Sequence, residues 1–225
     1  MAVILYHFGV PGFSGGFVGV DVFFVISGFL MTGIVIKGLE QGSFSVLAFY
    51  GARIRRIVPA LLGLCCVLLV LGYAVLTPPD YKTLATHALS AIGFVSNFKF
   101  WDEAGYFDIS SHEKWLLHTW SLSVEWQFYL LLPLLLSVVW RWKPGRIPQI
   151  IVLLGGIFLS LGLSVALTDR YPTTAFFLLP MRAWEMLAGG LVFILSPALR
   201  PNEFSRRWME TCGLALVVMS ILIFD

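Results

Sequence analysis

A polar stripe opens one of the apolar runs of this chain, and it holds the residues best suited to acid–base chemistry. His118, Ser121, Glu125 and Tyr129 lie three or four residues apart, at the start of a run that is apolar from residue 130 to residue 140. In a helix, this spacing places all four side chains on one face. Histidine exchanges protons near neutral pH, and a carboxylate on the same stripe can orient it or accept a proton. His118 and Glu125 are two helical turns apart, roughly 10 Å, so both can face one substrate without touching each other. A polar network that only ties helices together fits the same pattern.

Three arginines are candidates for binding an anionic ligand. Arg53 and Arg56 lie at positions i and i+3 of a short aromatic and basic stretch, and their forked donors could grip phosphate groups. Basic residues are also typical of the cytoplasmic ends of membrane helices, with no ligand involved. Arg182 lies three residues before Glu185, a spacing that favours an ion pair within one helix. Arg182 could instead bind a ligand's phosphates or pair with Glu125.

Two further polar residues lie near the start of the sequence. His7 follows a short apolar stretch and precedes a glycine-rich segment, which suits an interfacial histidine as well as a functional one. Asp21 lies within an apolar run, where a carboxylate is costly and often marks a functional site. It could equally favour the dipole at the N-terminus of a helix.

The elements that must position these residues are membrane-spanning helices. Of the 225 residues, 58% are hydrophobic and 12% are charged, whereas about a quarter of the residues in a soluble domain are charged. Apolar runs long enough to cross the hydrocarbon core of a bilayer recur along the chain. The fold class expected is therefore all-α, a polytopic transmembrane helical bundle embedded in a lipid bilayer.

Seven spans are expected, of which the first is truncated. Residues 1–8 are too short to cross the bilayer and are taken as the end of a helix that begins before this sequence. Pro59 is expected near the start of its span, where the missing N–H costs little. The six full spans are expected over residues 17–36, 57–76, 116–140, 150–167, 176–195 and 208–224.

The charges between the spans predict an orientation. Basic clusters follow alternate spans, so the positive-inside rule places those clusters in the cytoplasm and the loop 77–117 outside. Within that outer loop, residues 83–94 are expected to form an amphipathic helix, and residues 97–114 an aromatic, charged loop. A loop of this length is more often functional than a bare connector.

Several kinds of site are not indicated. The sequence has no P-loop, nucleophile elbow, dinucleotide-binding motif or zinc-protease motif. Its three cysteines have neither disulfide nor metal-ligand spacing. We expect no resident cofactor, no metal and no nucleic-acid partner.

Five stretches, taken together, resemble the membrane acyltransferase-3 family. They come in the family's order along almost the whole chain: Leu5–Phe8, Gly16–Phe29, Phe49–Pro59, His118–Tyr129 and Arg182–Gly189. The resemblance implies an O-acyltransferase of the inner (plasma) membrane that moves an acyl group, usually acetyl, from cytoplasmic acyl-CoA to hydroxyls of an exported glycan. O-antigen, peptidoglycan and exopolysaccharide are the glycans that it implies.

The resemblance also implies a role for each candidate residue. The expected catalytic residues, which deprotonate the acceptor hydroxyl or carry the acyl group for a time, are His7, His118 and Glu125. The expected ligands of acyl-CoA are Arg53, Arg56 and Arg182. The expected contacts of the acceptor are Asp21, Ser121 and Tyr129. Residues 1–225 would form one partial acyltransferase domain, because the family has more spans and a first-helix arginine that would precede Met1. The resemblance therefore leaves open whether this polypeptide is active alone.

Two other classes of protein fit parts of the pattern. A transporter or flippase also has polar residues inside its spans, but it would favour broken helices in two repeated halves, and the sequence has no such repeat. A structural or sensory membrane protein would tolerate replacement of His118 and Glu125.

Overall fold

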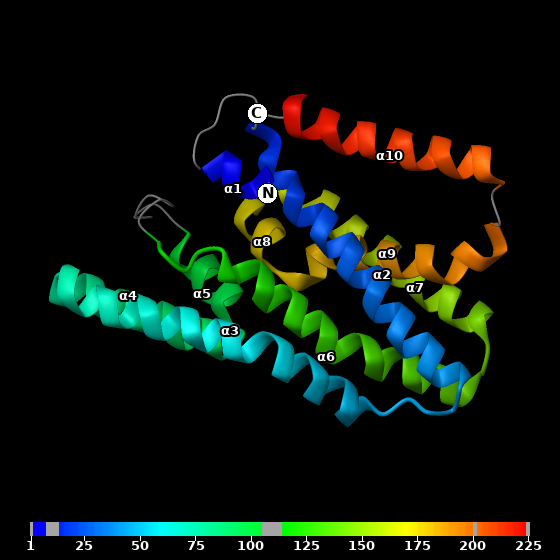
Figure 1. Cartoon of the computed structure of the whole chain (residues 1–225), viewed down its shortest axis with the longest axis horizontal. Helices are drawn as coiled ribbons and strands as arrows, with labels where there is room; N and C mark the ends of the chain where they lie inside the picture. The colour runs from blue at the N-terminus through cyan, green and yellow to red at the C-terminus, as the bar shows by residue number, and fades with distance from the viewer. Residues whose placement is uncertain (1, 8–13, 105–113, 200–201, 224–225) are drawn as a thin grey trace. The chain divides into compact units, whose positions relative to one another are not determined.

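The described residues of the chain fold into helices (Figure 1). The computed structural model describes residues 2–7, 14–104, 114–199 and 202–223, and the expected all-α class is confirmed. Five stretches are long and apolar enough to cross a membrane: Gly15–Glu40, Val46–Val75, Thr119–Trp142, Arg146–Thr168 and Pro172–Pro197. These match five of the expected spans, so a multi-pass membrane protein is confirmed, whereas the count of seven is not.

Two of the expected spans are not among these five stretches. Helix α1, Ala2–His7, is short, as its few apolar residues indicate. Helix α10, Glu203–Ile223, covers the expected seventh span but carries four charged side chains in its first half. Two of these, Arg206 and Glu210, form an ion pair 3.5 Å long on the exposed surface of the helix.

The chain divides into two compact units. The first contains residues 1–33 and 185–225, with α1, the 3-10 helix η1 (Ser14–Phe17), most of α2 (Val18–Glu40), most of α9 (Leu179–Leu199) and α10. The second contains residues 34–184, with α3 (Val46–Val75), α4 (Pro78–Ile92), α5 (Ser96–Glu103), α6 (Thr119–Trp142), α7 (Arg146–Thr168) and α8 (Pro172–Phe177).

Within the first unit, glycines let the backbones of α2 and α9 touch. A Cβ atom added at Gly28 would lie 1.8 Å from the carbonyl oxygen of Met186, and one added at Gly189 would lie 1.9 Å from that of Val25. Membrane helices pack closely where small residues meet, because apolar side chains alone gain nothing over lipid. No larger residue fits at either position without moving the two helices apart.

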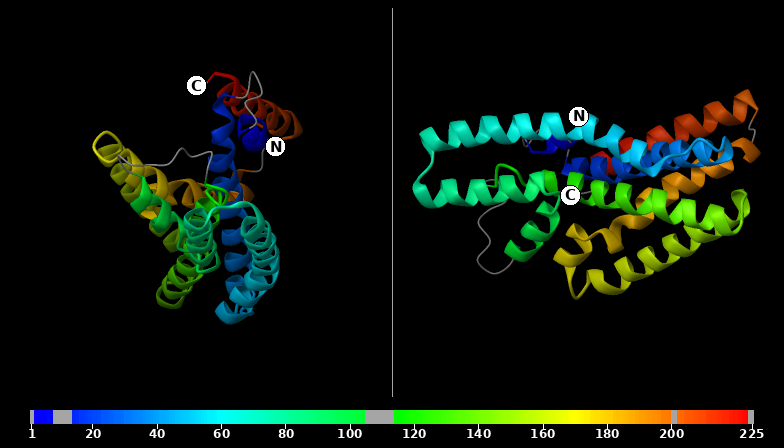
Figure 2. Two further views of the ribbon diagram at one scale, coloured as in Figure 1. Left: turned by 90° about the vertical axis from the view of Figure 1, so that its left-hand side faces the viewer. Right: turned by 90° about the horizontal axis from the view of Figure 1, so that it is seen from below.

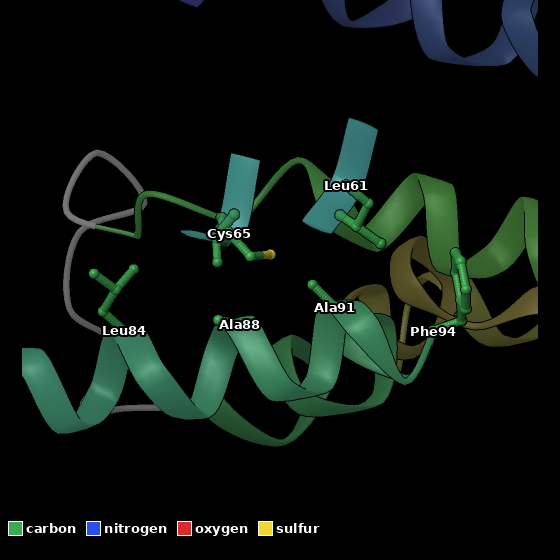
Figure 3. Close-up of a cluster of buried hydrophobic side chains, with 7 residues drawn as sticks. Leu61, Cys65, Leu84, Ala88, Ala91 and Phe94 are labelled. Atoms are coloured by element: carbon green, nitrogen blue, oxygen red, sulfur yellow. The ribbon is translucent and has the colours of Figure 1, made fainter. Parts of the chain in front are cut away.

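Within the second unit, α3 and α4 form an antiparallel pair over a buried apolar cluster. The right-hand view of Figure 2 shows the two helices side by side. Figure 3 shows Leu61 and Cys65 of α3 pointing toward Leu84, Ala88 and Ala91 of α4. The small alanines bring the two helices together, so the expected amphipathic helix packs its apolar face inside the protein.

Helix α3 begins earlier than the sequence indicates. It starts at Val46, where the Ser45 side chain accepts a hydrogen bond 3.3 Å long from the backbone N–H of Ala48. A serine N-cap satisfies a donor that would otherwise be left open at the helix start. The arginine-rich stretch is therefore part of the helix, and the prediction that Pro59 lies near the helix start is wrong. Pro59 lies well inside α3.

The prediction of a loop over residues 97–114 is wrong for its first part, because Ser96–Glu103 forms helix α5. Hydrogen bonds from neighbouring helices hold this short segment. Asn97 donates to the carbonyl oxygen of Phe177 over 3.2 Å, and Trp101 Nε1 donates to Thr174 Oγ1 over 2.9 Å. The rest of the expected loop lies largely outside the described residues.

A buried histidine and a carboxylate join α5 to α4. His87 is 2% exposed, and its Nε2 lies 3.0 and 2.9 Å from the two carboxylate oxygens of Glu103. Lys99 Nζ is 3.2 Å and Lys114 Nζ is 3.7 Å from the same carboxylate. The ring of Phe100 lies 4.8 Å from the ring of His87. Three nitrogen-bearing side chains thus converge on one carboxylate.

The glycine contacts predict that Gly189→Ala destabilises the protein. The added methyl group would overlap a backbone carbonyl of α2 that cannot move alone, and such overpacking costs about 1–3 kcal/mol. Gly155→Ala is the matched control, because its Cβ meets nothing within 4 Å. Thermal unfolding in detergent should show a melting temperature several degrees lower for Gly189→Ala only. Equal melting temperatures would contradict the close contact.

The contacts of Glu103 with His87 and Lys99 predict that the stability of the folded protein depends on pH. Burial works to raise the pKa of Glu103, but the hydrogen bonds and charges of His87 and Lys99 outweigh it, so the pKa lies below its ordinary value of 4.5. A lowered carboxyl pKa stabilises the folded state above the ordinary value, and this stabilisation is lost as the pH falls through the lowered one. We expect Glu103→Gln to lower the melting temperature at neutral pH and to weaken its fall below about pH 4.5. Asp102→Asn, at an exposed neighbour, should match wild type in both respects. If the melting temperature of Glu103→Gln depends on pH as that of wild type does, the Glu103 carboxylate does not stabilise the protein in this way.

Candidate functional site

The first turns of α6 contain a buried carboxyl group, that of Glu125, which is hydrogen-bonded to Tyr129. Glu125 and Tyr129 are 4% and 5% exposed, although both lie in a membrane-spanning helix. The Tyr129 hydroxyl donates a hydrogen bond to Glu125 Oε1, one helical turn away. The structure therefore brings together two members of the expected stripe, inside the protein and away from lipid.

The other two members of the stripe lie at the start of α6. His118 occupies the N-cap position and is exposed. Ser121 donates to the backbone carbonyl oxygen of His118 over 3.1 Å. The exposed imidazole of His118 and the buried carboxyl group of Glu125 thus lie roughly two helical turns apart on α6. Ser121 lies between them.

Next to the stripe, α6 carries polar residues that meet α5. The hydroxyls of Ser96 and Ser123 lie 2.7 Å apart, and Thr119 Oγ1 donates to Ser96 Oγ over 3.0 Å. Gln127 donates to the side chain of Asn97 over 2.8 Å. The sequence shows Ser123 and Gln127 as polar residues of this segment but gives no sign of their partners. The network fixes α5 against the polar part of α6.

The basic stretch of α3 lies beside the middle of α6. Tyr50 donates to the carbonyl oxygen of Leu130 over 2.7 Å, one residue after Tyr129. Arg53, one turn further along α3, is half-buried and lies 5.7 Å from the centre of the Phe49 ring. Its Nε is buried and has no hydrogen-bond partner among the residues that the structure describes. Arg56 is exposed. The two arginines could hold an anionic group near the segment of α6 that contains the carboxyl group.

Arg182 lies in the first turn of α9, between aromatic rings. Its guanidinium carbon is 5.8 Å from the centre of the Trp120 ring and 5.8 Å from that of the Phe176 ring. Both distances are within the range of a cation–π interaction. Trp120 belongs to the first turn of α6, so Arg182 lies at the end of α6 that carries His118. The rings were not among the expected partners of Arg182, and Trp120 is distant from it in sequence.

The remaining candidates belong to the first unit. Asp21 lies in the first turn of α2 and is half-buried, a place that suits a carboxylate at a helix N-terminus. His7 is the last residue of α1, and its side chain lies outside what the structure describes. Within the described ranges, His, Cys, Asp and Glu side chains do not gather in groups of three or more that could hold a metal ion.

The long apolar helices define a multi-pass membrane protein, and polar side chains are buried inside it. A family model described as "Acyltransferase domain" matches residues 1–225. The chain belongs to this family of membrane acyltransferases, and the resemblance based on the five stretches is confirmed.

Several relatives cover most of the chain. An uncharacterized protein of Haemophilus influenzae is 37% identical over 211 residues, which are 91% of this chain and 84% of that protein. The O-acetyltransferase OatA of Staphylococcus aureus is 34% identical over 212 residues, which are 92% of this chain and 35% of that protein. The peptidoglycan O-acetyltransferase OatA of Listeria monocytogenes is 34% identical, over 86% of this chain and 32% of that protein. The chain thus spans about a third of the length of the two OatA proteins. No solved structure matches it.

The bond between Tyr129 and Glu125 predicts that Tyr129→Phe destabilises the protein. The change removes one donor from a buried carboxyl group, and a buried acceptor that loses its hydrogen bond costs about 1–3 kcal/mol. Tyr73→Phe removes a hydroxyl from a residue that is 80% exposed and is the control. Thermal unfolding should show a loss of several degrees for Tyr129→Phe and none for Tyr73→Phe. If the two variants have the same melting temperature, the Tyr129 hydroxyl does not stabilise the site.

Proposed function

We propose that this chain is the membrane part of an O-acetyltransferase that moves an acetyl group from cytoplasmic acetyl-CoA to hydroxyls of a cell-envelope glycan. The observation that carries the proposal is the match of the whole chain to the acyltransferase family. Two relatives that are named O-acetyltransferases support acetyl as the group. One of them is named for peptidoglycan, which favours that glycan over O-antigen and exopolysaccharide. The membrane would be the inner (plasma) membrane, where acetyl-CoA is available on one side.

The donor would bind through the arginines of the second unit. Arg53 and Arg56 would hold its phosphates, because forked guanidinium donors match phosphate oxygens. The buried Nε of Arg53, without a partner among the described residues, supports this role. Arg182 lies at the other end of α6, beside Trp120. We therefore assign Arg182 to the acyl end of the donor, where it would stabilise negative charge on the thioester carbonyl.

In the proposed reaction, a histidine removes the proton from the acceptor hydroxyl. The hydroxyl oxygen then forms a bond to the acetyl carbonyl carbon, the carbon–sulfur bond of the thioester breaks, and the CoA thiolate takes up the proton. His7, or His118 supported by Glu125, would be the base. If the histidine attacks first, an acetyl-histidine forms and the acceptor displaces it in a second step.

The acceptor would approach from the outer side. The positive-inside rule assigns the end of α6 with His118 to that side, together with α4 and α5. Ser121 and Tyr129 would contact the sugar hydroxyls. Hydroxyl groups of this kind can form hydrogen bonds with a glycan and need no charge on it.

The proposal predicts that His7→Ala abolishes glycan acetylation. Cells that lack the gene would receive the intact gene as wild type or with one substitution, and the surface glycan would be examined by mass spectrometry. Loss of a general base lowers the rate by about 100- to 10,000-fold, so the acetyl-sized mass difference should vanish. Tyr73→Phe, at an exposed position of α3, should retain it, and both variants should insert into the membrane to the same extent.

Two results would count against this account. Glycan that remains acetylated with His7→Ala would remove His7 from the mechanism and leave His118 as the base. Identical glycan from cells with and without the intact gene would contradict acetyl transfer itself and would favour a transporter or a scaffold.

A further inference from the structure

At the start of α9, the hydroxyl of a serine from α7 lies between two backbone groups. Ser160 Oγ donates to the carbonyl oxygen of Pro180 over 2.6 Å, and it accepts a hydrogen bond from the backbone N–H of Trp184 over 2.9 Å. Ser160 is 5% exposed. Pro180 and Trp184 are four residues apart, which is the spacing that one backbone hydrogen bond joins in a regular α-helix. The serine hydroxyl thus bridges a pair of groups that a regular helix would join directly.

Such a bridge ties the first turn of α9 to α7. The two hydrogen bonds of Ser160 fix the Pro180 carbonyl and the Trp184 N–H relative to α7. Arg182 is the central residue of this turn, midway between Pro180 and Trp184. The direction in which its side chain leaves α9 therefore depends on the oxygen atom that Ser160 contributes.

The far end of the same side chain is held by the rings of Trp120 and Phe176, each 5.8 Å from the guanidinium carbon. A guanidinium group over aromatic rings keeps a defined plane and presents its N–H groups from its edge. The side chain is thus oriented at its base by Ser160 and at its tip by the rings. Reactions in which an arginine stabilises a developing charge are sensitive to displacements of about 1 Å.

We propose that Ser160 is a positioning residue for Arg182, and that it sets the angle at which the guanidinium meets the acyl end of the donor. Ser160 contacts no substrate and acts only through the turn that it holds. The inference rests on the proposed acetyl transfer, because the role of Arg182 does. It adds a residue of α7 that belongs to none of the stretches that resemble the family.

The test is a double-mutant cycle in the intact membrane protein. Ser160→Ala removes both hydrogen bonds that hold this turn against α7, so the orientation of Arg182 is no longer fixed at its base. We expect Ser160→Ala to lower kcat for acetyl transfer by about 10- to 100-fold, with a smaller change in the KM for acetyl-CoA. In the background of Arg182→Gln, Ser160→Ala should cause no further loss. A purely structural serine would lower activity equally in both backgrounds.

Two variants complete the design. Ser160→Thr keeps the hydroxyl and should recover most of the activity. Ser164→Ala removes the same atom one turn further along α7, at a half-buried position, and should behave as wild type. The amount of inserted protein and its melting temperature identify any variant that fails to fold. If Ser160→Ala fails to fold, Ser160→Cys takes its place.

The outcomes separate the inference from the function on which it rests. Two results with an active wild-type protein would overturn the role of Ser160 alone. In the first, Ser160→Ala has the same kcat for acetyl transfer as Ser164→Ala. In the second, the loss of activity from Ser160→Ala adds to the loss from Arg182→Gln. No transfer by the wild-type protein would overturn the proposed function, and the role of Ser160 with it.

Discussion

A polar group inside a membrane helix is stable only where another polar group of the protein meets it, since lipid offers no hydrogen bonds. The second unit satisfies this requirement by pairing its buried polar side chains. Tyr129 donates to Glu125 within α6, and Ser160 of α7 bridges two backbone groups of α9. The hydroxyls of Ser96 and Ser123 meet between α5 and α6. These pairings hold α5 against α6 and the first turn of α9 against α7.

Further contacts place arginine and carboxyl side chains around α6. The buried carboxyl group of Glu125 lies in the segment that Tyr50 of α3 contacts through Leu130, one turn before Arg53. Arg182 meets Trp120 at the end of α6 that carries His118. Scaffold and site are therefore built from the same hydrogen bonds, and a substitution in the network should change both stability and the geometry of the site.

The sequence predicts the long helices well, because runs of apolar residues and the charges that flank them reflect the bilayer directly. It predicts the stripe on α6 for the same reason, since costly polar residues stand out in such runs. It does not predict α5, whose residues are typical of a loop and whose helix depends on partners in α6 and α8. The start of α3 was missed because one serine cap decides it. The partners of Arg182 were missed because Trp120 is remote in sequence, and Ser160 because a lone serine in an apolar run does not reveal what it bonds to.

The central claim is that the polar part of α6 takes part in moving an acetyl group across the membrane by covalent chemistry. The most direct measurement uses vesicles that contain the intact protein in one orientation, with labelled acetyl-CoA on the cytoplasmic side and a glycan acceptor on the other. The account predicts covalently labelled glycan with wild type and with Asp102→Asn, and none with Glu125→Gln. Glycan or acetyl-CoA that crosses the membrane unchanged, or labelling by Glu125→Gln at the wild-type rate, would contradict it.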